Sequence, residues 1–252
     1  MNSIWVGFDK REGTAFGVAR DTIKRKLTQQ IPVYGLLLED LKRRGLYTRP
    51  TEYRPSALDK PVMWDVISDA PMSTEHANAR FLVPHLANLV FNGEADWAVF
   101  LDGDTMALGN LARLFKLLDA SKAVYCVHHN HQPTTTTKMD GQVQTSYNRK
   151  NWTSVMALNC RHPSVKALTP DVVNTLPGRD LHRFCWLKDE EIGELDPSWN
   201  FLVGHSDPTI KPNIVHFTDG VPDMPGYENV PYADEWREAV NDWARGSLSL
   251  PG

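Results

Sequence analysis

Two carboxylates follow directly after an apolar segment in AVFLDGDTM, residues 98–106. Residues 98–101 read as the end of a buried strand, and Asp102 and Asp104 come next, separated by Gly103. Burying unpaired charge is costly, so we expect the pair where the strand ends and a loop begins, with both side chains facing one cleft. Two such oxygen ligands suit a hard divalent cation that also holds a phosphate. The alternative is a simple turn, because Asp and Gly both favour turns.

A histidine near the end of a later apolar segment is the candidate third ligand. His216 lies in KPNIVHFTDGVP, residues 211–222, before a Gly/Pro turn. Neutral imidazole joins carboxylates on manganese-like ions, and strand ends converge at one edge of an open sheet whatever their separation in the sequence. A hydrogen-bonded strand histidine without a metal is the alternative.

Other segments carry groups that suit polar ligands. Arg80, in STEHANARFLVP, offers a fork of donors for a diphosphate, or else extends its stem along an apolar surface. LKDEEIGELDPSWN, residues 187–200, places Trp199 and Asn200 beside several carboxylates, a combination typical of sugar recognition; the alternative is a solvated acidic face. The histidines at 128, 129 and 131 have no carboxylate or cysteine at ligand spacing, so we read them as part of a polar loop.

The elements that must position these residues alternate as in an α/β protein. A strand, a helix and a second strand within the first 40 residues indicate a parallel sheet. The proline-rich residues 45–72 predict an irregular, lid-like loop, and a helix over 73–90 is expected to kink at Pro84. The strands are expected at 4–8, 32–38, 98–101, 123–127, 153–159 and 214–217, and the helices at 14–27, 41–44, 73–90, 111–118, 164–186 (interrupted by Pro170 and Pro177) and 233–244.

Composition excludes several classes of function. The chain has 252 residues, a net charge of −4 and 23% charged residues, so no basic excess supports nucleic-acid binding. Three widely spaced cysteines without a C-x-x-C pair argue against a disulfide framework or a thiolate zinc site. The N-terminus lacks the apolar core of a signal peptide, and no apolar stretch approaches the ~18 residues of a membrane span. We therefore expect one cytoplasmic domain without internal repeats.

Six segments, taken in order, resemble a known family. They span residues 3–222 and read VGFD, STEHANARFLVPHL, AVFLDGDTMAL, NWTSVMALNC, DEEIGELDPSWN and IVHFTDGVP. Together they resemble GT-A fold glycosyltransferases and are most similar to glycosyltransferase family 8, which includes glycogenin and galactosyltransferases of lipopolysaccharide synthesis. The resemblance implies a single Rossmann-like α/β domain over residues 1–252, with a mixed, mostly parallel central sheet flanked by helices. Residues 1–110 would form the nucleotide-binding half, 111–222 the donor-sugar and acceptor half, and 223–252 a C-terminal helix.

The resemblance also implies roles for individual residues. Asp102, Asp104 and His216 match the family's metal ligands. Asn159 matches an asparagine that faces the donor sugar. The family's acidic–polar pair, usually Asp-Gln, is matched by two residues that we take with Asn159 as the catalytic candidates, Asp189 and Glu190. The donor would be contacted by Phe8 and Asp9 at the nucleoside, by Arg80 near the phosphates, and by Asp102, Gly103, Asp104, Asn200 and Gly220.

The implied activity is transfer of a sugar from a nucleotide-sugar donor, UDP-linked, to a hydroxyl group of a glycan, lipid-linked, protein or small-molecule acceptor. Mn²⁺ or Mg²⁺ would bridge the donor phosphates. The late motif lacks the family's lysine, for which Lys138 or Arg149 are candidate replacements, and Glu190 stands in place of Gln, which leaves retention of configuration open. The sequence also leaves open the donor sugar, the acceptor and the oligomeric state.

Two alternatives use the same groups differently. One is a non-catalytic nucleotide-sugar or carbohydrate-binding protein on the same scaffold. The other is a metal-dependent nucleotidyltransferase, which would carry a glycine-rich phosphate loop after the first strand. Residues 7–13 read GFDKREG and contain too few glycines for such a loop.

Overall fold

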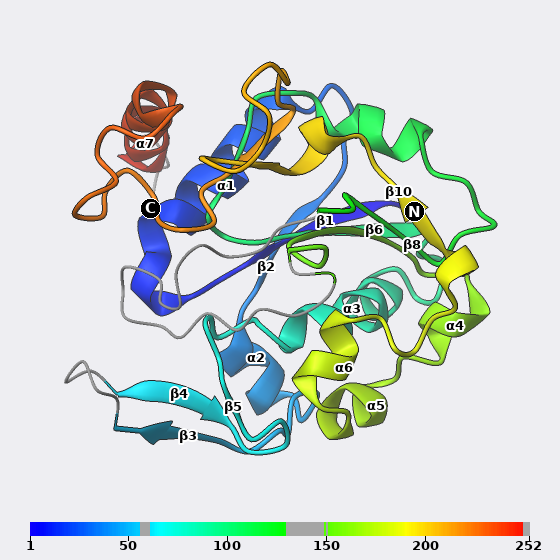
Figure 1. Ribbon diagram of the computed structural model, residues 1–252. Coiled ribbons are helices and arrows are strands. Elements are labelled where there is room, and N and C mark those ends of the chain that lie inside the picture. Colours follow the sequence, from blue (N-terminus) through cyan, green and yellow to red (C-terminus); the bar gives the residue numbers. More distant parts are fainter. Residues whose placement is uncertain (56–60, 130–148, 150, 249–252) are drawn as a thin grey trace.

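The computed structural model describes residues 1–55, 61–129, 149 and 151–248, and within them a mixed six-stranded sheet forms the centre of the fold (Figure 1). The strand order is β10-β8-β9-β6-β1-β2. Every pairing is parallel except those of β9, which runs antiparallel to both neighbours. The carboxyl ends of the parallel strands therefore meet at one edge, together with the start of β9. The bounds are Ser3–Gly7 for β1, Val33–Leu36 for β2, Trp97–Leu101 for β6, Val124–Cys126 for β8, Val155–Asn159 for β9 and Ile192–Glu194 for β10.

Helices cover both faces of this sheet, as Figure 1 shows. Side chains alternate between the two faces along a strand, so in β6 Phe100 joins one buried cluster and Val99 joins the other. The first face packs against α2 (Leu38–Arg43), α3 (Val83–Val90) and the short helices α4 (Pro163–Lys166), α5 (Pro170–Thr175) and α6 (Gly178–His182). The second packs against α1 (Gly13–Lys26) and the 3-10 helix η3 (Leu111–Lys116). The expected α/β class with a flanked mixed sheet is confirmed.

A second, three-stranded sheet lies beside α1 and continues directly from the carboxylate turn. Its order is β11-β12-β7, with β11 at Phe201–Leu202, β12 at Ile214–His216 and β7 at Thr105–Ala107. The strand β12 pairs antiparallel with β7 and parallel with β11. The C-terminal helix α7 (Ala233–Leu248) packs here through Trp236, which meets Phe217 edge to face. This sheet therefore fixes residues 104 and 216 relative to each other.

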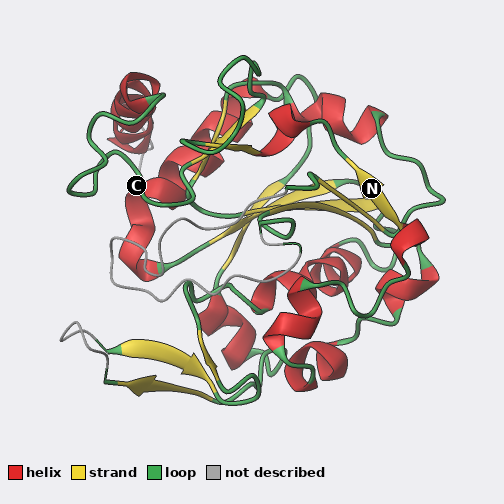
Figure 2. Cartoon of the chain, in the orientation of Figure 1, coloured by secondary structure: helices red, strands yellow, loops and turns green. Residues whose placement is uncertain are grey.

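Three strands within the described part of 45–72 form a small antiparallel sheet, so the prediction that this stretch is irregular is wrong (Figure 2). The strands are β3 (Thr51–Arg54), β4 (Val62–Asp65) and β5 (Ala70–Pro71). A fully buried ion pair between Arg49 and Asp65 anchors it, and Arg49 Nη1 also donates to the carbonyl of Val173 at 2.7 Å. The prolines bound the strands instead of disrupting them, as Pro tolerates strand ends; they are Pro50, Pro55, Pro61 and Pro71.

Three further prolines, which were expected to kink or interrupt helices, lie at the starts of helices. The predicted helix over 73–90 starts only at Val83, after turns and the 3-10 helix η2 (Ala79–Leu82). Pro84 stands in the first turn of α3, where its missing N–H costs nothing, so no kink arises. Pro170 likewise opens α5, and Pro177 precedes α6.

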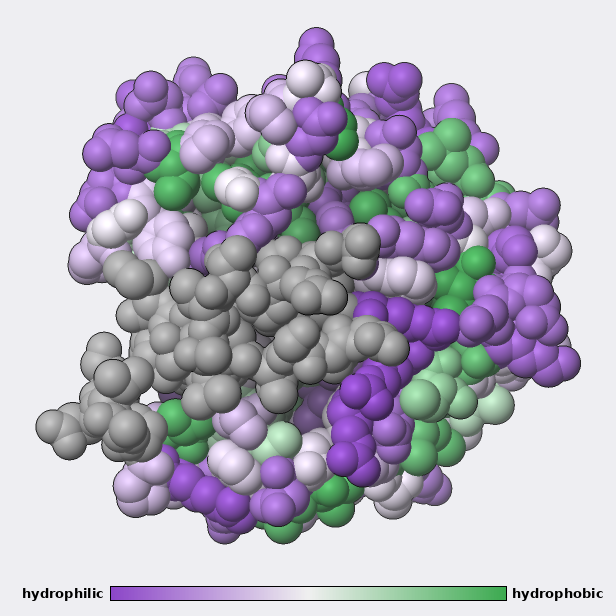
Figure 3. All heavy atoms as spheres, in the orientation of Figure 1, coloured by the Kyte–Doolittle hydropathy of each residue, from purple (hydrophilic) through white to green (hydrophobic). Residues whose placement is uncertain are grey.

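The surface of the described residues is mixed in character. On the face shown in Figure 3, hydrophobic residues lie scattered among hydrophilic ones over the described part of the chain. Across the described ranges, no helix has the length and apolar character needed to cross a membrane.

Candidate metal and donor site

Three predicted ligands meet at the carboxyl edge of the central sheet. One ligand atom each from Asp102, Asp104 and His216 lies within 4.8 Å of the others. The strand β6 ends at Leu101, and the hydroxyl of Thr105 donates to the carbonyl of Asp102 at 2.8 Å, which closes the turn. Because Thr105 pairs with His216 across β7 and β12, Nε2 of His216 lies 3.2 Å from Oδ1 of Asp104.

The turn between the two aspartates requires a glycine. A Cβ on Gly103 would lie 2.6 Å from the backbone carbonyl oxygen of Gly7, a distance that real Cβ atoms essentially never show. A Cβ on Gly7 would in turn lie 2.5 Å from the ring of His76. The two glycines therefore let the carboxylate turn, the end of β1 and His76 approach one another.

Asp102 is held by two basic side chains. Its Oδ1 lies 3.0 Å from Nε2 of His76 and 2.8 Å from Nη2 of Arg80. Burial alone would raise the pKa of Asp102, but the charge of Arg80 and the hydrogen bond with His76 outweigh burial and hold the pKa well below its usual range. The carboxyl group is therefore ionised at neutral pH, as a cation ligand must be.

Arg80 is engaged within the protein. Its Nε donates to the carbonyl of Ala77 at 2.9 Å, and Nη1 donates to the carbonyl of Thr153 at 2.8 Å and to Oδ2 of Asp102 at 3.3 Å. The side chain is almost fully buried, and its guanidinium lies 4.9 Å from the ring centroid of Phe100. Arg80 thus orients Asp102, whereas its contact with a donor phosphate stays a prediction.

His216 has a partner on its other ring nitrogen. Nδ1 lies 3.0 Å from Oδ1 of Asn200, which is completely buried at the end of the 3-10 helix η5 (Pro197–Asn200). The amide nitrogen of Asn200 donates to Oγ of Ser154 at 2.9 Å and to the carbonyl of Asn151 at 3.2 Å. Both ends of the Asn200 side-chain amide therefore have partners inside the protein. The predicted contact of Asn200 with the donor stays a prediction.

The ligand atoms of Asp102, Asp104 and His216 suit a divalent cation. Two carboxylates and one imidazole nitrogen are ligands that Mn²⁺ accepts, and carboxylates also suit Mg²⁺. An imidazole lone pair and a carboxylate oxygen 3.2 Å apart repel each other unless a proton or a cation lies between them. The buried position of His216 strengthens that repulsion, because water screens it less.

The end of β1 lies against the same cluster. The carbonyl oxygen of Phe8 is 3.3 Å from Nδ1 of His76, whose other nitrogen contacts Asp102. Asp9 is buried, forms an ion pair with Arg11 at 2.7 Å and accepts the backbone N–H of Glu75 at 3.0 Å. Burial alone would raise the pKa of Asp9, but the hydrogen bonds from Arg11 outweigh it and lower the pKa. Phe8 and Asp9 thus contact His76 and Glu75, and His76 in turn contacts the carboxylate turn.

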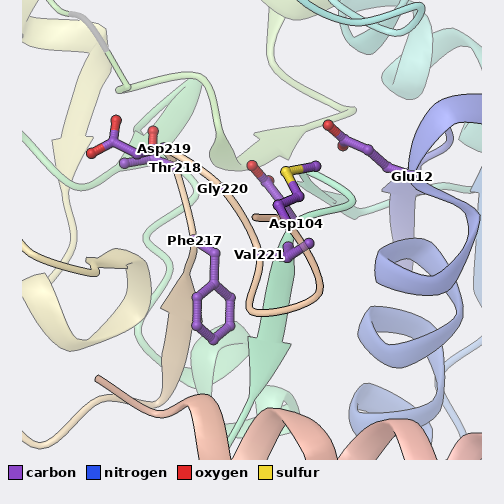
Figure 4. A pocket seen from close by; sticks show the side chains of 8 residues that line it. Glu12, Asp104, Phe217, Thr218, Asp219, Gly220 and Val221 are labelled. Carbon is purple, nitrogen blue, oxygen red and sulfur yellow. The ribbon is translucent and has the colours of Figure 1, made fainter. Parts of the chain in front are cut away.

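A pocket opens beside Asp104 (Figure 4). Its walls come from three places in the chain: Glu12 before α1, the carboxylate turn, and the loop after β12. The predicted Gly220 lies in that loop, and a Cβ there would lie 2.8 Å from the ring of Tyr227. The lining residues are Glu12, Asp104, Phe217, Thr218, Asp219, Gly220, Val221 and Met224.

The three catalytic candidates are not brought to this cluster. Asn159 pairs with Trp97, the first residue of β6, and its amide donates to the carbonyls of Ala120 and Lys122, both at 3.0 Å. Asp189 and Glu190 belong to the 3-10 helix η4 (Asp189–Glu191) just before β10, so their backbone lies at the start of a parallel strand. All three lie at the amino edge of the sheet, whereas Asp102 lies at the carboxyl edge.

The antiparallel direction of β9 explains the misplacement of Asn159. In an antiparallel strand the first residues, not the last, face the carboxyl edge of its neighbours. Here these are Thr153 and Ser154, which directly precede β9, and the backbone N–H of Asp102 donates to the carbonyl of Ser154 at 2.9 Å. The sequence reading missed these two residues and His76. Thr153 and Ser154 carried a signal as polar residues directly before an apolar segment, whereas His76 stands at no such boundary.

Of the two residues proposed to replace the family's lysine, the structure describes only Arg149. Lys138 lies outside the described residues. Arg149 forms an ion pair with Asp189, and its guanidinium lies 5.3 Å from the ring centroid of Trp152. Of the histidine group read as a polar loop, His128 stacks flat on Trp152 with centroids 4.0 Å apart, and 131 lies outside the described residues.

The architecture is the GT-A fold of glycosyltransferases. Galactosyltransferase LgtC, solved in complex with donor and acceptor sugar analogs, superposes with a TM-score of 0.54 at 13% identity over 100% of this chain and 98% of its own. The glycosyltransferase GlyE of Streptococcus pneumoniae gives 0.56 at 13% identity, covering 99% of this chain and 64% of GlyE. The bifunctional glycosyltransferase WbbM gives 0.53 at 14% identity over 94% of this chain, which spans 51% of WbbM.

Similarity in sequence identifies the family. Protein CDI of Arabidopsis thaliana is 38% identical over 245 residues, which cover 95% of this chain and 86% of that protein. The chain therefore belongs to the family of Protein CDI. No family model matches it.

Proposed function

We propose that the protein is a glycosyltransferase that depends on a divalent cation and transfers a sugar from a UDP-linked donor to a hydroxyl acceptor. The observation that carries this proposal is the position of Asp102, Asp104 and His216, within 4.8 Å of one another at the carboxyl edge of a GT-A sheet. Ligands of open α/β sheets bind at that edge. LgtC, which shares the fold, is described with donor and acceptor sugar analogs bound.

Asp102, Asp104 and His216 would hold Mn²⁺ or Mg²⁺. When bound, such a cation supplies Lewis-acid stabilisation of a leaving diphosphate. Arg80 and His76 keep Asp102 ionised and oriented, while Phe8 and Asp9 would line the nucleoside site at the end of β1. Gly103 and Gly220 keep the backbone free of side chains on two sides of Asp104.

The proposal also covers the type of glycosyltransferase, its domain organisation, its stereochemistry and its location in the cell. We assign the chain to the glycosyltransferase family 8 type and treat residues 1–252 as one domain, with a nucleotide half at 1–110, a donor-sugar and acceptor half at 111–222 and a C-terminal segment at 223–252. Retention of configuration is part of this proposal. We place the protein in the cytoplasm because its three cysteines are free thiols, as is usual in a reducing compartment.

The replacement Asp104→Asn tests the proposal. It removes the charge of one ligand and keeps the shape of the side chain, so we expect Mn²⁺-dependent turnover of UDP-sugars to fall by at least about 100-fold while the fold is retained. Release of UDP, measured with a panel of UDP-sugars and Mn²⁺, gives the readout.

Asp119→Asn is the matched control, because this exposed aspartate precedes β8 at the amino edge and should keep wild-type turnover. Full activity of the Asp104 variant, or undiminished wild-type activity in excess chelator, would contradict the proposal. Binding of UDP-sugars by the wild type without any turnover would indicate the non-catalytic alternative.

A further inference from the structure

The side-chain amide of Asn200 has a fixed orientation. Its nitrogen lies 3.2 Å from the backbone carbonyl of Asn151, and a carbonyl oxygen only accepts hydrogen bonds. The NH₂ group must therefore face Asn151, and its second hydrogen goes to Oγ of Ser154 at 2.9 Å. The carbonyl oxygen of the amide is left facing His216.

This orientation selects one tautomer of His216. Oδ1 of Asn200 lies 3.0 Å from Nδ1 and can only accept, so when a cation occupies Nε2 the proton must lie on Nδ1. The neutral ring then has its lone pair on Nε2, the atom that lies 3.2 Å from Oδ1 of Asp104. Metal-bound histidines commonly have the nitrogen away from the metal fixed by such a partner.

Ser154 joins this arrangement to the aspartate turn. Its hydroxyl accepts from Asn200 and donates to the carbonyl of Asn151 at 2.7 Å, which fixes the direction of both bonds. Its backbone carbonyl accepts the N–H of Asp102 at 2.9 Å. One buried residue before β9 therefore touches the strand end that carries Asp102 and the amide that orients His216.

We propose that Asn200 and Ser154 are positioning residues that hold His216 as the Nδ1–H tautomer, with Nε2 presented toward Asp104 for a cation. This inference rests on the proposed metal-dependent function and assigns residues behind the ligands. Neither side chain needs to touch the cation or the donor. The arrangement uses neutral groups throughout, so it adds no charge to the site.

The tautomer can be measured in saturating, diamagnetic Mg²⁺, without donor or activity. Two-bond ¹H–¹⁵N correlation spectra of the full-length protein with ¹⁵N-labelled histidine, in alkaline buffer, distinguish the two tautomers, and the spectrum of His216→Asn identifies the signal of His216. We expect the proton on Nδ1 in the wild type. Asn200→Ala removes the acceptor, so the signal should move toward that of a ring that exchanges between tautomers.

Metal affinity gives the second readout. Calorimetric titration with Mn²⁺ should show binding about 10- to 100-fold weaker for Asn200→Ala. Ser154→Ala removes one of the two acceptors of the Asn200 amide and should give a smaller loss. Ser198→Ala is the matched control: this buried hydroxyl lies in the same 3-10 helix but contacts Asn213, so tautomer and affinity should match the wild type.

The outcomes separate this inference from the function on which it rests. A proton on Nε2 of wild-type His216, or an unchanged tautomer and affinity in Asn200→Ala, would overturn the positioning role while Mn²⁺ binding stood. A folded wild type that bound no Mn²⁺ would overturn both the proposed metal function and the positioning of His216 for a cation. Equal losses in the Asn200 and Ser198 variants would mean a general packing effect and would also overturn the assignment.

Discussion

At the scale of single residues, the candidate site is organised by contacts behind its ligands. Asp102 is held by Arg80 at 2.8 Å and by His76 at 3.0 Å, and His216 is held by Asn200 at 3.0 Å. Asp102 and His216 each keep one ligand atom within 4.8 Å of the other two ligands of the cluster. Removing such a partner typically weakens metal affinity by about 10- to 100-fold.

Asp9 gives a residue-scale prediction on pH. Its pKa in the folded protein lies below the usual aspartate value of 3.8, so ionised Asp9 stabilises the fold. That stabilisation is complete above the unfolded pKa and is lost as the pH falls through the lower folded pKa. In Asp9→Asn the free energy of unfolding, measured with urea across a series of pH values, should be lower near neutrality and should fall less steeply in acid. Parallel pH profiles of the two proteins would contradict this.

At the scale of elements, the pairing of two short strands creates the site. The strands β7 and β12 place Thr105 opposite His216, which brings Asp104, one residue earlier, against the imidazole. The turn that allows this is packed on the end of β1 at Gly103. The geometry of the cluster is therefore set by backbone pairing, and the side chains complete it.

Gly103→Ala tests this dependence on the backbone. The added Cβ would lie 2.6 Å from the backbone oxygen of Gly7, which cannot rotate away, so the turn must shift. We expect Mn²⁺ affinity in calorimetry to fall by about 10-fold or more, with a smaller loss of thermal stability. Gly13→Ala is the control, because nothing lies within 4 Å of a Cβ there, at the first residue of α1. Equal metal affinity in the two variants would contradict the account.

The sequence predicts those elements whose pattern is local. The strands expected at 4–8, 98–101 and 214–217 could be predicted because each is an apolar run bounded by polar residues. The structure confirms their ends to within a residue or two. The strands β7, β10 and β11 have three residues or fewer and too little pattern to be recognised. The sheet over 51–71 was missed because its prolines resemble loop signals, although they stand at strand ends.

The candidate site was predictable only in part for a related reason. Asp102, Asp104 and His216 carry their chemistry in their residue types and in their positions beside strands. The direction of β9 is set by its pairing with β6 and β8, and no local sequence pattern indicates that direction. The family resemblance therefore pointed to Asn159, at the end of β9, and not to Ser154, directly before its start. His76 and Asn200 act through other side chains, and those contacts exist only in three dimensions.

At the scale of the whole molecule, similarity in sequence identifies the family and similarity in structure identifies the architecture. The family of Protein CDI matches 95% of the chain at 38% identity, and structures such as LgtC share the GT-A fold at 13% identity. The GT-A fold is therefore shared with proteins of very different sequence. The Asp102 turn, the end of β1 and the β7–β12 pair meet at the edge of that sheet where the fold places its ligands.

The central claim is that this edge holds a divalent cation between Asp102, Asp104 and His216. The most direct measurement is anomalous X-ray scattering from crystals of the wild-type protein soaked in Mn²⁺, with crystals of Asp104→Asn as the comparison. We expect a manganese peak at ~2.0–2.3 Å from a carboxylate oxygen of Asp102, a carboxylate oxygen of Asp104 and Nε2 of His216, which is lost or much weaker in the variant. Manganese bound elsewhere, with this cluster unchanged and free of any peak, would contradict it.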